Sequence, residues 1–123
     1  MITEHPGLAQ LAEELENVID SVASAFGEGA VRTVEGELDV DPANPGHLLC
    51  WQYGVRLEQA GEPERRLVEI ILPSLEHTGW QAQDRSTSRE LIARFSRDGA
   101  DFTVHITRAG HAVAIVGSTR PLP

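Results

Sequence analysis

The feature that most constrains the fold is a change of hydrophobic period along the chain, from about 3.6 residues to about 2. Between residues 6 and 26, apolar side chains recur with the spacing of one helical stripe. Pro6 suits the first position of a helix, and Gly27 can end it. We therefore predict an amphipathic helix over residues 6–26.

The next segments alternate apolar and polar residues, which is typical of strands. We predict a half-buried strand over residues 31–40, with its apolar side in the core and its acidic side, which includes Glu35, Glu37 and Asp39, in solvent. The apolar side comprises Val34, Leu38 and Val40. Turn-forming residues separate this strand from a second alternating run at 48–57, so the two predict a β-hairpin.

A second helix is predicted to begin at Pro63. Pro73 lacks an N–H group and crowds the preceding turn, so we expect the helix to kink or restart there. Gly79 favours the left-handed conformation after the last turn. We therefore predict a Schellman closure in which the side chains of Trp80 and Leu75 touch.

Four short alternating runs follow, with connections short enough for hairpins. They are the segments 80–85, 90–96, 101–107 and 112–117. The fold class that follows is α+β, a two-layer sandwich of order α-β-β-α-β-β-β-β, with two helices on one face of a mainly antiparallel sheet. The 123 residues are expected to form one domain over 1–123.

Three motifs lie in the second half of the chain: LEHTGW at the end of a predicted helix, FSRDG at the end of a predicted strand, and the final IVGSTRP. With these motifs, this part of the chain resembles the C-terminal half of many small actinobacterial proteins and lipoproteins of unassigned function. The resemblance covers roughly residues 67–121 and implies a helix followed by a β-meander. It implies no activity.

Charge is distributed unevenly along the chain, whose net charge is −9. Residues 1–64 hold 13 acidic residues and two arginines, whereas residues 65–123 hold 6 acidic residues and 8 arginines. An acidic protein repels phosphate backbones, so we expect no nucleic acid as a partner and consider a basic partner protein instead. The same charge could serve solubility alone.

Membrane and secretion signals are not expected either. No apolar run approaches the length of a membrane span. The first residues, MITEHPGLAQ, lack a basic segment followed by an apolar one, so we predict no signal peptide and a cytoplasmic location.

Searches for catalytic and metal-binding patterns give no candidate, so we predict no enzyme, no cofactor and no metal. The chain has no lysine and no HExxH, GxSxG or phosphate-loop pattern. Cys50 is expected to be a small buried hydrophobic residue. If Ala109 and Gly110 form a two-residue turn, His105 faces residue 114, and His105 and His111 lie on opposite faces and cannot share an ion.

The face of the sheet away from the helices is the predicted interaction surface. We place Phe95, Phe102, Val104, Ile106 and Val116 on the helix side. The residues predicted to face away and to contact a partner are Ile92, Arg94, Thr103, His105, Thr107, Val113 and Ile115. Leu48 and Cys50 of the first hairpin are expected beside them. Such a mixed set fits a protein-binding surface or a homodimer interface, and it could also be a solvated sheet face.

The leading functional hypothesis is therefore a small acidic, non-enzymatic interaction factor of adaptor, chaperone-like or immunity type. Its exposed sheet face would bind a partner protein. The alternative is a small-ligand-binding protein or modest enzyme, with a pocket between sheet and helices near Trp51, Tyr53 and Trp80.

Overall fold

Residues 5–123 are described by a computed structural model of the chain. The first helix, α1, spans Pro6–Phe26, as predicted, and the His5 side chain caps it by accepting a hydrogen bond from the Leu8 N–H at 3.2 Å. The second helix runs as three consecutive pieces, α2 (Pro63–Arg66), η1 (Leu67–Ile71) and α3 (Leu72–His77).

In the described part of the chain, six strands form one sheet in which every neighbouring pair is antiparallel. They are β1 (Val31–Asp39), β2 (Leu49–Leu57), β3 (Gln81–Asp84), β4 (Glu90–Arg97), β5 (Ala100–Thr107) and β6 (Val113–Ser118). Their order in the sheet is β1-β2-β6-β5-β4-β3. The last strand of the meander therefore inserts beside the first hairpin and leaves β1 and β3 as the two edges.

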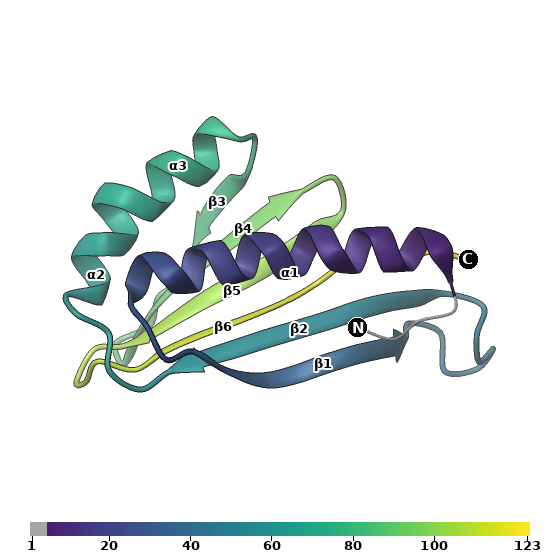
Figure 1. Cartoon of the computed structure of the whole chain (residues 1–123), viewed down its shortest axis with the longest axis horizontal. Helices are drawn as coiled ribbons and strands as arrows, with labels where there is room; N and C mark the ends of the chain where they lie inside the picture. Colours follow the sequence, from purple (N-terminus) through teal and green to yellow (C-terminus); the bar gives the residue numbers. More distant parts are fainter. Residues whose placement is uncertain (1–4) are drawn as a thin grey trace.

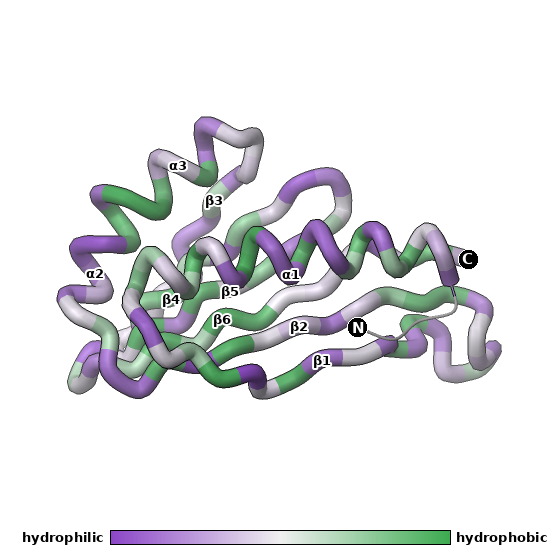
Figure 2. The backbone as a smooth tube through the Cα atoms, in the orientation of Figure 1, coloured by the Kyte–Doolittle hydropathy of each residue, from purple (hydrophilic) through white to green (hydrophobic). Residues whose placement is uncertain are grey.

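Both helices lie on the same face of the sheet, which gives the predicted two-layer α+β architecture (Figure 1). The core lies between the layers and includes the apolar stripe of α1, alternate residues of β2, β4, β5 and β6, and the inner side of the second helix. Hydrophobic and hydrophilic residues alternate along α1, as Figure 2 shows, which matches a helix with one buried side.

The second helix accommodates Pro73 by a local change of hydrogen-bond pattern. The Leu72 N–H bonds the carbonyl of Leu67, five residues back, so the segment just before the proline is a π-turn. A π-turn is a common way to absorb an interruption of the helical hydrogen-bond ladder. The predicted break at Pro73 is thus present, and regular helix resumes at Leu72.

The end of the second helix is the predicted Schellman closure. Gly79 has φ +93°, its N–H bonds the Glu76 carbonyl at 3.1 Å, and the Trp80 N–H bonds the Leu75 carbonyl at 3.0 Å. Leu75 and Trp80 are both buried in the core. The Gly-Trp pair therefore ends the helix and anchors the chain as it enters β3.

Candidate functional site: an uncovered sheet face and its β1 edge

Within residues 5–123, the helices cover only one face of the sheet, so the other face is uncovered (Figure 1). The pairing registers define which residues share this uncovered face. One row across it joins Val34, Gly54, Val116, Thr103 and Arg94. This row is thus apolar near β1 and becomes polar toward β4.

Five of the seven residues predicted to contact a partner do lie on the uncovered face. Ile92, Arg94, Thr103 and His105 are half-buried there, and Thr107 is exposed. Two of them form ion pairs or hydrogen bonds along the face. The Arg94 guanidinium lies 3.1 Å from the Asp101 carboxylate, and His105 Nδ1 lies 3.0 Å from the Glu90 carboxylate.

The other two, Val113 and Ile115, were placed on the wrong face. Both are fully buried, because they lie opposite Ile106 and Val104 on the side that packs against the helices. Val116, predicted to meet the helices, instead faces away and is 40% exposed. The residues of β6 that were predicted to face the helices therefore face away from them, and those predicted to face away are buried under them.

The prediction that the apolar side of β1 lies in the core was also wrong. The acidic residues Glu35 and Asp39 lie on the helix side, opposite Tyr53 and Leu49 of β2. The apolar residues lie exposed instead, with exposed fractions of 66% for Val31, 36% for Val34, 42% for Leu38 and 43% for Val40. The β1 edge, meaning residues 31–40, is thus exposed, with one apolar side and one mainly acidic side on which Arg32 lies 3.5 Å from the Glu35 carboxylate.

Glycine at position 54 extends this apolar surface onto the neighbouring strand. A Cβ atom at Gly54 would lie 2.9 Å from Val34 Cγ1, so the glycine lets the valine lie over β2. Val116 follows Gly54 in the same row on β6. Val34 and Val116 therefore flank a shallow apolar strip beside the edge of the sheet.

The backbone of the β1 edge has a definite orientation. The Val40 N–H donates to the Leu48 carbonyl at 2.9 Å. In an antiparallel pair of strands, every second pair of opposed residues exchanges hydrogen bonds, so Leu38 and Cys50 exchange them as well. Residues between these pairs, Glu35 and Asp39 among them, direct their N–H and C=O groups away from β2. The outer side of β1 carries backbone donors and acceptors that point to the open edge.

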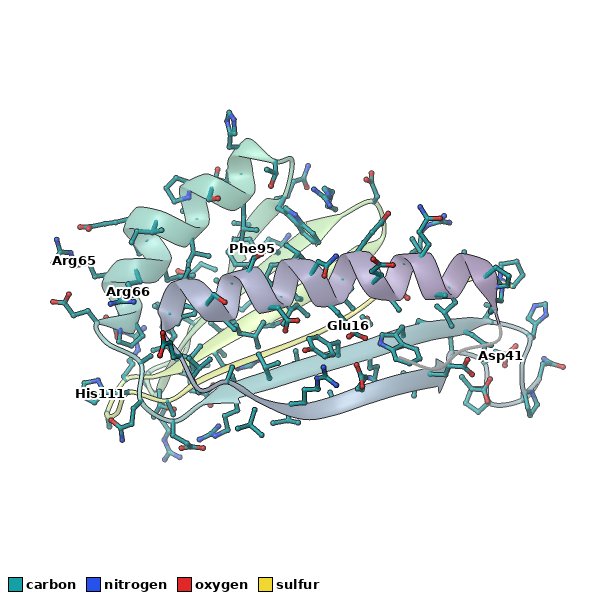
Figure 3. All side chains as sticks on the ribbon, viewed as in Figure 1. Glu16, Asp41, Arg65, Arg66, Phe95 and His111 are labelled. Carbon is teal, nitrogen blue, oxygen red and sulfur yellow. The ribbon has the colours of Figure 1, made fainter. Side chains whose placement is uncertain are left out.

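Beneath α1, side chains from three elements form a network that the sequence analysis missed. The Trp51 indole N–H donates to the Glu16 carboxylate at 2.8 Å, and the Tyr53 hydroxyl donates to Asp20 at 2.7 Å. Glu35 of β1 joins it, because its carboxyl group interacts with that of Glu16 and raises the pKa of Glu16. Figure 3 places Glu16 on the side of α1 that faces β1 and β2.

The spacing of the two acids and of the two aromatic residues in the sequence is a signal for this network. Glu16 and Asp20 are one helical turn apart, which corresponds to about 6 Å along a helix. Trp51 and Tyr53 are two residues apart, which corresponds to about 6.6 Å along a strand. Because a buried indole N–H and a buried phenol each need an acceptor, two acids at matching spacing on the covering helix are the expected partners.

The network shifts the protonation equilibria of its members. Burial, followed by the hydrogen bond with Glu35, raises the pKa of the Glu16 carboxyl group. Burial, followed by the hydrogen bond to Asp20, raises the pKa of Tyr53 to about 12. Both shifts favour the uncharged form of the group in the folded protein, whereas the hydrogen bond from Trp51 favours the charged Glu16 and lowers its pKa.

The shift of Tyr53 gives a direct prediction, because it is the sole tyrosine in the chain. The unfolded chain loses the phenol proton near pH 10 and the folded protein near pH 12. The contribution of Tyr53 to stability is therefore complete below pH 10 and is lost as the pH rises from 10 to 12. Titration of the absorbance at 295 nm measures both values, and a midpoint near 10 in the folded protein would contradict the network.

The histidine and cysteine residues are the side chains that could bind a metal ion or act as a nucleophile. Residues 5–123 bring no three His, Cys, Asp or Glu side chains into an arrangement that could hold a metal ion. His105 lies opposite Ala114, as the predicted turn requires. Cys50 is buried, and burial raises the pKa of its thiol, which disfavours the reactive thiolate.

The surface is hollowed beside each of the two helices. A groove of about 370 Å³ lies between the second helix and strands β3 and β4, and its apolar lining includes Leu67, Leu72 and Leu91. A smaller pocket of about 250 Å³ lies between α1 and the β4–β5 hairpin, and Trp80 lines it. Trp51 and Tyr53, which were predicted to share a pocket with Trp80, are instead buried under α1.

Comparisons with known proteins add no assignment. No protein-family model, no curated protein and no solved structure matches this chain. Within residues 5–123, no helix is both long enough and apolar enough to cross a bilayer. The resemblance to small actinobacterial proteins stays a prediction.

Proposed function

We propose that this protein is a small acidic interaction factor that binds a partner protein through the uncovered sheet face and the β1 edge. The observation that carries the proposal is the exposed apolar side of β1, formed by Val31, Val34 and Leu38, in a sheet whose helices cover only the other face. Contiguous exposed apolar residues beside open backbone groups are typical of interaction surfaces.

Charge favours a basic partner. Glu16 and Asp20 of α1 lie against the hairpin with the acidic side of β1, and residues 1–64 of the sequence hold 13 acidic residues and two arginines. Such a field accelerates association with a positively charged surface and weakens with added salt. The polar part of the uncovered face, with Arg94 and His105 already paired to carboxylates, would form the rim of the contact.

Capture of partners from a lysate of the source cells tests the proposal. We expect the immobilised protein to retain specific partners at low salt and to release them at high salt. Leu38→Glu should abolish retention, because it places a charge on the apolar side of β1. The matched control is Ile70→Glu on the second helix, where the isoleucine is 56% exposed, and it should retain the same partners.

Two results would overturn the proposal. One is a protein that is strictly monomeric by light scattering and retains nothing at low salt. The other is an identical set of retained proteins for Leu38→Glu and Ile70→Glu, which would remove the β1 edge from the contact.

A second candidate function is the binding of a small apolar molecule in the groove beside the second helix. The groove has a volume of about 370 Å³, within the range of ligand sites, and the π-turn Leu67–Ile71 forms one wall. A thermal-shift screen with aliphatic and aromatic compounds discriminates the two functions. A ligand that raises the melting temperature without affecting partner capture would favour the groove.

A further inference from the structure

We propose that the β1 edge takes an extended segment of the partner as a seventh, antiparallel strand, and that basic and apolar residues alternate in this segment. The inference rests on the proposed function and specifies the chemistry of the partner. Its geometric basis is the position of β1, which within residues 5–123 pairs with β2 alone. Addition of a strand to an open sheet edge is an established mode of peptide recognition.

The hydrogen-bonding pattern determines which residues would meet. Glu35 and Asp39 direct their backbone N–H and C=O groups to the open edge, as the Val40 to Leu48 hydrogen bond establishes. An added antiparallel strand exchanges hydrogen bonds with these residues. Residues that lie directly opposite one another in such pairs also share a face of the sheet.

The two sides of β1 then specify the side chains of the added strand. Residues opposite Glu35 and Asp39 lie on the acidic side, where an arginine or lysine gains a favourable charge interaction. The residues between them lie on the side of Val34 and Leu38, where an apolar side chain covers exposed apolar surface. The complementary sequence therefore alternates basic and apolar residues.

A second copy of this chain fits the edge poorly. Two antiparallel copies of β1 place side chains of the same side opposite one another. Glu35, Glu37 and Asp39 all lie on one side, so a register that pairs the middles of the two strands puts acid opposite acid. Like charges directly opposite are destabilising, and charged edges are a known protection against self-pairing. The same acids attract a basic strand.

The register irregularity between Arg32 and Val34 limits where the added strand can pair. A bulge bends and twists a strand and interrupts its ladder. The regular part of β1 runs from Val34 to Asp39. We therefore expect the partner segment to pair mainly with this part.

A synthetic peptide of alternating arginine and valine, as long as the 9 residues of β1, is the probe. Binding is measured by fluorescence anisotropy at low salt. In the antiparallel arrangement the arginine N–H groups bond β1, and the valine N–H groups point outward. A peptide N-methylated at its arginines should therefore bind at least about tenfold more weakly, since it loses several backbone hydrogen bonds. N-methylation at the valines should change affinity little.

The two N-methylated peptides have the same charge and nearly the same composition, so they separate strand addition from charge attraction. Equal binding of both would overturn the inference, and so would equal binding of a peptide with its arginines in one block. Leu38→Glu tests the apolar side in the protein. It should weaken binding of the alternating peptide, because a charged side chain replaces the apolar contact with the valines.

The experiment also separates this inference from the proposed function. If the alternating peptide does not bind while partner capture still depends on Leu38, strand addition is wrong and partner binding stands. If capture fails as well, both are wrong.

Discussion

Trp80→Ala should lower the free energy of unfolding by about 3 kcal/mol or more, which is the usual cost of truncating a buried aromatic residue to alanine. The indole is 4% exposed, and its ring packs edge-on against Phe102 with centroids 5.0 Å apart. The Arg97 guanidinium covers it at 4.6 Å from the ring centroid. Removal of the ring therefore leaves a cavity where the end of the second helix meets the sheet.

Urea denaturation followed by far-ultraviolet circular dichroism measures this change. Trp80→Phe is the matched control, because it keeps an aromatic ring against Phe102 and removes less side-chain volume than alanine does. It should lower the free energy of unfolding clearly less than Trp80→Ala. A Trp80→Ala protein that unfolds like the wild type, yet no longer captures a partner, would assign Trp80 to binding and refute its structural role.

The features that the sequence predicted correctly are those determined by local chemistry. Gly79 can adopt a positive φ at low cost, Pro73 lacks an N–H group, and Pro63 suits a first helical turn, wherever these residues lie in space. The bounds of α1 and the closure at Trp80 follow from such constraints. The order of helices and strands follows from hydrophobic period.

The exposure of β1 depends on the order of the strands in the sheet, and the hydrophobic periodicity of the sequence does not determine this order. A six-stranded sheet is about 24 Å wide at about 4.8 Å per strand spacing, and two helices side by side cover about 20 Å. An edge strand can therefore extend beyond the helical layer. Because β6 inserts beside β2, β1 becomes that edge, and its alternation turns Val34 and Leu38 to the uncovered face, where they stay in solvent, while Glu35 and Asp39 lie on the helix side.

The phase of β6, by contrast, could have been predicted. The turn at Ala109 and Gly110 predicts that His105 lies opposite residue 114, and this register is present. Residues opposite each other share a face, so the register itself places Ala114 and Val116 with His105. The assignment of Val113 and Ile115 to the uncovered face contradicted it. For a short apolar strand, the pairing register therefore predicts which face of the sheet each residue points to better than the composition of the strand does.

Gly117→Ala should also destabilise the protein strongly, by about 3 kcal/mol, at the upper end of the range for overpacking. Gly117 lies between Tyr53 of β2 and Phe102 of β5 on the helix side of the sheet. A Cβ atom there would lie 2.4 Å from the Asp101 carbonyl oxygen and 2.5 Å from Phe102 Cβ. These atoms belong to the main chain or are attached directly to it, so rotation of a side chain cannot relieve the clash.

The expected response is a local separation of β5 from β6, which also moves Phe102 away from Trp80 and from Phe95, whose ring centroid lies 5.2 Å from that of Phe102. Gly36→Ala is the matched control, because Gly36 is also a strand glycine but a Cβ atom added to it would meet no atom within 4 Å. It should leave stability unchanged or raise it slightly, since alanine reduces the entropy of the unfolded chain. Equal urea midpoints for the two variants would show that the β5–β6 contact is looser than the geometry at Gly117 requires.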